Sequence, residues 1–135
     1  MNMDGVYLFS PLVDVVVSLE DCLPIQSGET KSVGSMTMSA GGGANTLFAA
    51  SRVGLSIAPF GTIGCDELGK RILSDYAKER ISTDYIQTDA SRQTASVIVL
   101  VDSAGKHAFA SILECYLGDL TKLSEAIQKS SFVIA

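Results

Sequence analysis

The stretch from Ser39 to Thr46 contains three consecutive glycines and constrains the fold more than any other segment of the chain. Glycine lets the backbone adopt positive φ and come close to a ligand. The glycines stop where a helical run over 44–53 begins, and the first N–H groups of a helix have no internal partner. The segment therefore predicts a polar cradle with Asn45 as a hydrogen-bonding side chain on its rim. Taken alone, the glycines equally predict a turn that only connects a strand to a helix.

Length and composition fit one domain or part of one. The chain has 135 residues, 47% of them hydrophobic, and a mean hydropathy of +0.30, which is high for a small domain. Fully buried parallel strands read as continuous apolar runs and produce such a composition, and so does a piece of a larger fold whose remainder covers apolar surface. The formal net charge of −5 disfavours nucleic acid and anionic membranes as partners.

The three cysteines, Cys22, Cys65 and Cys115, stand far apart in the sequence. An odd number without close pairs predicts reduced thiols and a cytoplasmic location. A zinc site needs more ligands than these and the single histidine, His107, which we expect on the surface of a hairpin. The N-terminal residues favour neither a signal nor a transit peptide, and no apolar run has the length of a membrane span.

Apolar periodicity predicts strands that alternate with helices, which is typical of an α/β fold. The clearest helix spans 66–80, where an apolar stripe stands opposite outward-facing charged residues that include Asp75. Further helices are expected over 44–53 and 120–129. A hairpin turn is expected over 102–105, and the hairpin-like strands are expected to form a second, smaller sheet. The predicted strands are 6–9, 14–19, 32–39, 56–62, 85–87, 96–101, 107–113 and 132–134, with loops over 24–30 and 88–92.

The glycine stretch is part of a longer pattern. Ala-Gly-Gly-Gly-Ala-Asn at 40–45 is followed by Ala-Ala-Ser-Arg-Val-Gly at 49–54 and by Pro-Phe-Gly-Thr-Ile-Gly-Cys-Asp at 59–66. This pattern closely resembles the first signature of the PfkB/ribokinase family of carbohydrate kinases. That family also shows an Asp after its first strand, a Leu-Pro followed by Gly-Glu, and a Thr that opens a lid strand. The matching residues are Asp14, Leu23, Pro24, Gly28, Glu29 and Thr94.

The chain also departs from the family pattern. Leu12 stands where the family often has Asn, Leu47 where it has a small residue, and Gly42 where some members have Lys. Family members are considerably longer, and their second signature, a Gly-Ala-Gly-Asp with the catalytic base and anion hole, is not found. The resemblance therefore implies that residues 1–135 are the N-terminal part of one kinase domain, including its lid strands and lacking the ATP-binding half.

The resemblance implies a ribokinase-like, mostly parallel sheet flanked by helices, with a small β-sheet lid. It implies phosphoryl transfer from ATP, with Mg²⁺, to a sugar hydroxyl, and it places no catalytic or metal-binding residue in this chain. Asp14 stands among apolar residues, and a buried carboxylate needs a partner, although an edge-strand Asp facing water is an alternative. The substrate-binding residues that the resemblance implies are Asp14, Gly41, Gly42, Asn45, Ser96 and Ile98, although packing is the favoured interpretation for the last two.

The implied partners are a small sugar and, through the lid, a second copy of the chain. A nucleoside kinase of the same family is an alternative, and so is a non-catalytic module that binds through its lid. We expect the isolated chain to be inactive, and to be oligomeric because its last strand presents an open edge.

Residues 64–71 nearly form a P-loop, G-x-x-x-x-G-K-[S/T]. Arg71 replaces the hydroxyl that would hold Mg²⁺, and Asp66 and Glu67 would put negative charge inside a phosphate cradle. The segment is therefore interpreted as the start of a helix. The glycine run at 41–43 also lacks the third glycine of a dinucleotide-binding fingerprint.

Overall fold

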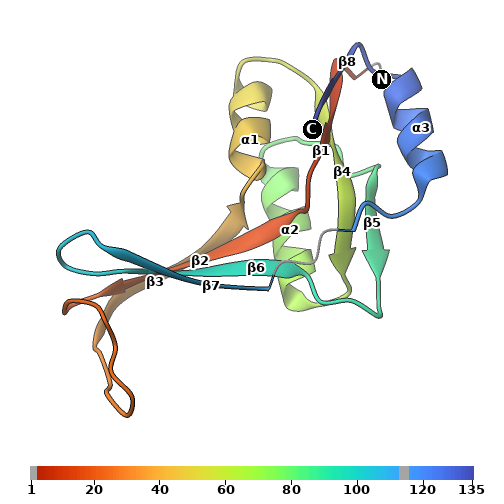
Figure 1. Cartoon of the computed structure of the whole chain (residues 1–135). Helices are drawn as coiled ribbons and strands as arrows, with labels where there is room; N and C mark the ends of the chain where they lie inside the picture. Colours follow the sequence, from red (N-terminus) through yellow and green to blue (C-terminus); the bar gives the residue numbers. More distant parts are fainter. Residues whose placement is uncertain (1–2, 113–115) are drawn as a thin grey trace.

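The computed structural model of the chain describes residues 3–112 and 116–135, which form two four-stranded sheets and three helices (Figure 1). The strands are β1 (Gly5–Leu8), β2 (Leu12–Leu19), β3 (Val33–Gly41), β4 (Ile57–Gly64), β5 (Ile86–Asp89), β6 (Ala95–Val101), β7 (His107–Ile112) and β8 (Phe132–Ile134). The helices are α1 (Ala44–Arg52), α2 (Glu67–Lys78) and α3 (Leu120–Gln128).

The first sheet is parallel throughout and has the strand order β5-β4-β1-β8. Successive side chains of a strand point to opposite faces, so β4 supplies both sides of the core. Ile57 and Ile63 belong to the cluster that α1 and α2 cover, whereas Phe60 packs with Val6 and with Ala126 of α3. Helices therefore lie on both faces of this sheet (Figure 1).

The second sheet has the order β3-β2-β6-β7, and it projects away from the first sheet as an arm (Figure 1). Only the central pair, β2 and β6, is parallel. At the base of the arm, Val13 and Ala40 belong to the same buried cluster as Ile72 and Tyr76 of α2. This packing attaches the arm to the α/β body.

The predicted α/β class, the mostly parallel sheet with flanking helices, and the second sheet are confirmed. Asp66 is the N-cap of α2, so residues 64–71 are the end of β4 followed by a helix start, as predicted. His107 is exposed on β7, and Cys22 and Cys65 are exposed free thiols, whereas Leu113 and Cys115 lie outside the described residues. None of the helices in the described ranges has the length and apolar character needed to cross a membrane.

Three details differ from the sequence-based expectation. The second sheet has as many strands as the first rather than fewer, because β2 and β3 join the hairpin strands β6 and β7 through the pairing of β2 with β6. β5 continues to Asp89, into the predicted loop 88–92, because it pairs with β4 through that residue. Asp75 was expected on the outer face of its helix, but it is only 9% exposed because β3 packs against it.

Candidate functional site

Asp14 is the third residue of β2, a central strand with β3 on one side and β6 on the other. Asp14 therefore does not lie on an edge strand, as one alternative expected. Asp14 is half-buried and lies opposite Ser39 of β3 and Val97 of β6. Within the part of the chain that the structure describes, its carboxylate accepts no hydrogen bond.

Gly41 is the last residue of β3, two residues beyond the predicted strand end, and it lies directly beneath the Asp14 carboxylate. A Cβ atom at Gly41 would lie 2.1 Å from Asp14 Oδ2 and 2.2 Å from Asp14 Cγ. Gly41 is not among the glycines with positive φ, so its backbone conformation is open to other residues. A glycine is needed here because the carboxylate occupies the space of a side chain.

The next two glycines turn the chain from β3 into α1. Gly42 has a φ of +57°, in the left-handed region that glycine adopts without strain. Gly43 is the N-cap of α1 and offers no side chain to the helix terminus, and the first turn contains no acidic residue. The positive end of the helix dipole is therefore open, with the exposed Asn45 in its first turn.

The structure does not bring Ser96 and Ile98 together with Asp14. Side chains alternate along β6, and the register places Ser96 beside Val13 and Ile98 beside Val15. On this face of the second sheet, Val13 belongs to the buried cluster that includes Ile72 and Tyr76 of α2, and Val15 packs against that cluster. Ser96 and Ile98 lie two and four residues after Thr94, which is 1% exposed, so alternation places them on its side of the strand and not on that of Asp14.

The opposite face of the second sheet carries Asp14 together with Val97 and Val99, which the sequence reasoning missed. Val97 lies directly beside Asp14, and Val99 follows one row further along the arm, beside Val16. Both valines are half-buried. Alternation from Asp14 across the β2–β6 pair would have identified them, had the pairing of these distant strands been known.

The near-P-loop cannot serve as a phosphate cradle, because a carboxylate of the chain occupies it. Asp66 accepts hydrogen bonds from the N–H of Gly69 (2.8 Å), the N–H of Thr94 (2.8 Å) and the Thr94 hydroxyl (2.6 Å). Burial by itself raises the pKa of Asp66, but these hydrogen bonds outweigh it and hold the pKa below its ordinary value. Lys70 is exposed and pairs with Glu67. The segment joins α2 to the start of β6.

No group of three or more His, Cys, Asp or Glu side chains in residues 3–112 and 116–135 is arranged to hold a metal ion. Asp14, Asn45 and the start of α1 instead form a polar surface: a carboxylate without a hydrogen-bond partner among the described residues, an amide side chain and an open helix terminus. Such groups can accept and donate hydrogen bonds.

Comparison with known proteins adds the family context. A family model described as pfkB family carbohydrate kinase matches residues 11–133. The ribokinase of Haemophilus influenzae is 32% identical over 82 residues, which are 60% of this chain and 27% of that protein. The solved structure of Halothermothrix orenii fructokinase is 29% identical, has a TM-score of 0.70, and is matched over 87% of this chain and 41% of that one.

The fold is also that of an Arabidopsis thaliana ribokinase complexed with ribose and ATP, with a TM-score of 0.79 at 21% identity. The match covers 98% of this chain and 45% of that ribokinase. The chain thus spans less than half the length of the relatives that it matches.

Proposed function

The chain belongs to the pfkB family of carbohydrate kinases, and we propose that it forms the sugar-binding part of an enzyme that transfers a phosphoryl group from ATP to a sugar hydroxyl. The observation that carries this proposal is the Asp14 carboxylate, which is half-buried over Gly41 and has no hydrogen-bond donor among the described residues. A carboxylate accepts several hydrogen bonds, and sugar hydroxyls supply donors.

The neighbouring groups fit the same ligand. Asn45 both donates and accepts, so it matches a hydroxyl in either role. Gly41 makes room for the Asp14 carboxylate itself, and the exposed Gly42 lies in the turn beside it. Val97 and Val99 offer an apolar surface beside Asp14 for the C–H face of a sugar ring. We therefore assign Val97 and Val99, rather than Ser96 and Ile98, to the proposed sugar site.

The reaction requires parts that we do not assign to this chain. We propose that ATP and Mg²⁺ bind elsewhere in the complete enzyme, since the phosphate-loop-like segment 64–71 is closed by Asp66. Catalysis of phosphoryl transfer consists mainly of positioning and charge stabilisation. We propose that this chain contributes the positioning, because it holds one hydroxyl of the sugar in place.

A free sugar is favoured over a nucleoside because the relatives with 30% identity or more are named ribokinase, fructokinase and sugar kinase. We further propose that two copies pair through the second sheet. Large apolar side chains stand exposed along its strands, which supports such an interface. They are Val33, Met36, Ile98, Phe109 and Ile112.

The test is isothermal titration calorimetry of the purified complete enzyme with ribose, fructose, adenosine and ATP, comparing wild type with Asp14→Ala. Loss of charge-assisted hydrogen bonds costs about 1.5–3 kcal/mol, so the variant should bind the preferred sugar about 10- to 150-fold more weakly. Affinity for ATP should not change. Asp21→Asn is the matched control, because Asp21 is an exposed carboxylate just beyond the far end of β2.

Equal sugar affinity in wild type and Asp14→Ala would remove the proposed site. Selective binding of adenosine would instead establish the nucleoside alternative, and binding of none of these ligands would favour a non-catalytic role.

A further inference from the structure

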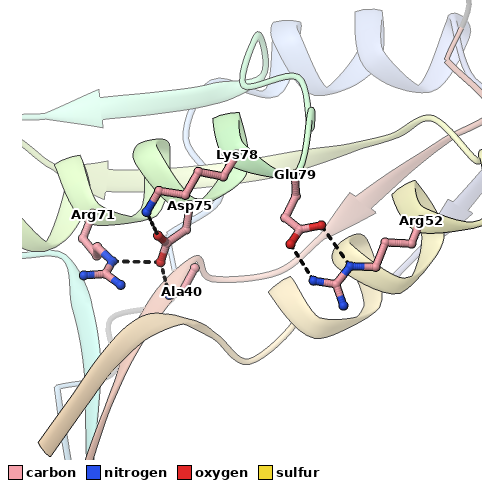
Figure 2. Close-up of polar contacts among 6 residues, drawn as sticks. All are labelled: Ala40, Arg52, Arg71, Asp75, Lys78 and Glu79. Atoms are coloured by element: carbon pink, nitrogen blue, oxygen red, sulfur yellow. Dashed lines mark hydrogen bonds and ion pairs between the residues drawn. The ribbon is translucent and has the colours of Figure 1, made fainter.

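Asp75 is a buried carboxylate of α2 that does not belong to the site described above. It is 9% exposed, and its Oδ2 atom accepts hydrogen bonds from the backbone N–H of Ala40 at 3.0 Å and from Arg71 Nε at 2.9 Å (Figure 2). Its Oδ1 atom accepts from Lys78 Nζ at 3.1 Å. The two cations compensate the charge of Asp75, so the carboxylate is committed to contacts within the chain.

The hydrogen bond from Ala40 to Asp75 satisfies a backbone N–H at an edge of the second sheet. β3 is an edge strand, and Ala40 pairs with Val13 of β2 on its inner side. Ala40 is only 3% exposed, so water does not replace a missing partner. A buried N–H without an acceptor costs about 1–3 kcal/mol. Asp75, which lies 35 residues after Ala40 in the sequence, supplies the acceptor and so avoids this cost.

The same helix also holds the element on the other side of the glycine turn. Arg52 of α1 pairs with the Glu79 carboxylate, with Nε at 3.0 Å from Oε2, and Ser51 Oγ donates to the Glu79 carbonyl at 2.7 Å (Figure 2 shows the Arg52–Glu79 pair). Asp75 and Glu79 are four residues apart and so face the same way, at the C-terminal end of α2. The turn over residues 41–43 thus runs between two attachments to α2.

We propose that Asp75 is a positioning residue for the sugar site: by holding the N–H of Ala40, it fixes the backbone of Gly41 beneath Asp14. This inference rests on the proposed function for its consequence in sugar binding. Ala40 is joined to Gly41, and the space above Gly41 is filled by the Asp14 carboxylate. A shift of the end of β3 therefore displaces the carboxylate or opens a gap beneath it. Asp75 acts through Ala40 and touches no ligand itself.

The test combines two measurements on the purified complete enzyme. Amide hydrogen exchange reports the anchoring without any ligand, and calorimetry reports affinity for ATP and for the sugar that wild type binds best. In Asp75→Ala we expect the Ala40 amide to exchange about tenfold faster or more, and the sugar to bind about tenfold more weakly, with unchanged ATP affinity.

Two variants separate anchoring from charge and from general stability. Asp75→Asn keeps an oxygen that accepts from Ala40 N–H, and it should restore sugar affinity to within about threefold of wild type. Arg71→Gln removes an ion-pair partner of Asp75 and leaves the Ala40 bond intact, so it should change neither measurement. Asp75→Leu, close in shape to the carboxylate, replaces Asp75→Ala if that variant does not fold.

The proposal is overturned if the apolar variants leave Ala40 exchange or sugar affinity at the wild-type level, or if Arg71→Gln has the same effect as Asp75→Ala. If wild type binds no sugar, the proposed function fails. Faster Ala40 exchange in the apolar variants alone would still support the anchoring of β3, and unchanged exchange would refute it.

Discussion

Replacing Gly41 by alanine should weaken sugar binding while leaving the fold intact. The added Cβ would lie 2.1 Å from Asp14 Oδ2, whereas a carbon and an oxygen in contact need about 3.3 Å, so the carboxylate must move by about 1.2 Å. The obstacle is the end of a side chain, and the Gly41 backbone conformation suits alanine. Rotation of Asp14 relieves the overlap, so the free energy of unfolding should change by less than about 1 kcal/mol.

A displacement of this size is enough to break a hydrogen bond whose donor and acceptor lie about 2.7 Å apart. The expected loss of sugar affinity is therefore that of a charge-assisted hydrogen bond, about 1.5–3 kcal/mol or 10- to 150-fold. Gly34→Ala is the matched control in the same strand, since a Cβ there meets Glu20 Cγ at an ordinary 3.6 Å.

Calorimetry on Gly41→Ala, Asp14→Ala and the double variant tests the reasoning. Because Gly41→Ala acts through Asp14, the double variant should bind the sugar no more weakly than Asp14→Ala alone. Wild-type affinity in Gly41→Ala, or two losses that simply add, would refute the idea that Gly41 serves the carboxylate.

Three further predictions concern the surrounding structure. Arg80 follows the end of α2 with a φ of 58°, a left-handed backbone conformation in which glycine is usual. Arg80→Gly should therefore raise the free energy of unfolding, measured in urea titrations, by about 1 kcal/mol. An unchanged or lower free energy of unfolding would show that the backbone of Arg80 carries no strain. Hydrogen bonds outweigh burial and hold the pKa values of Asp66 and Asp75 below their ordinary value of 3.8, so the stability that these groups contribute is present at neutral pH and is lost as the pH falls below that value. Urea titrations at a series of acidic pH values should show this loss of stability, and the loss should be smaller in Asp75→Asn than in wild type. Identical pH profiles of the free energy of unfolding in the two proteins would contradict this prediction. Lys70→Ala should leave ATP affinity unchanged because Lys70 pairs with Glu67 at an exposed helix start, and a selective loss of ATP binding would restore the P-loop interpretation.

The sequence was sufficient for the parts of this molecule that depend on local pattern. The apolar stripe and the capping Asp66 define α2 within its own residues, and the glycine run identifies the turn between β3 and α1. A charged residue within an apolar strand requires an explanation wherever it lies, and Asp14 was selected because it also matches the Asp of the family resemblance.

The remaining features depend on contacts between distant segments. Asp75 reads as one more outward-facing charge of an amphipathic helix, and only the packing of β3 against α2 makes it a buried acceptor for Ala40. The choice between Ser96 and Val97 depends in the same way on which face of β6 turns towards α2. The alternation of side chains predicts that Ser96 and Val97 lie on opposite faces of the sheet, but the pairing of β2 with β6 decides which of them lies beside Asp14.

A crystal structure of the protein with its preferred sugar tests the central claim most directly. We predict that a sugar hydroxyl lies within about 3.0 Å of the Asp14 carboxylate, that Asn45 contacts the ligand, and that Val97 lines the same side. A sugar bound elsewhere, or against the face that carries Ser96 and Ile98, would contradict the account.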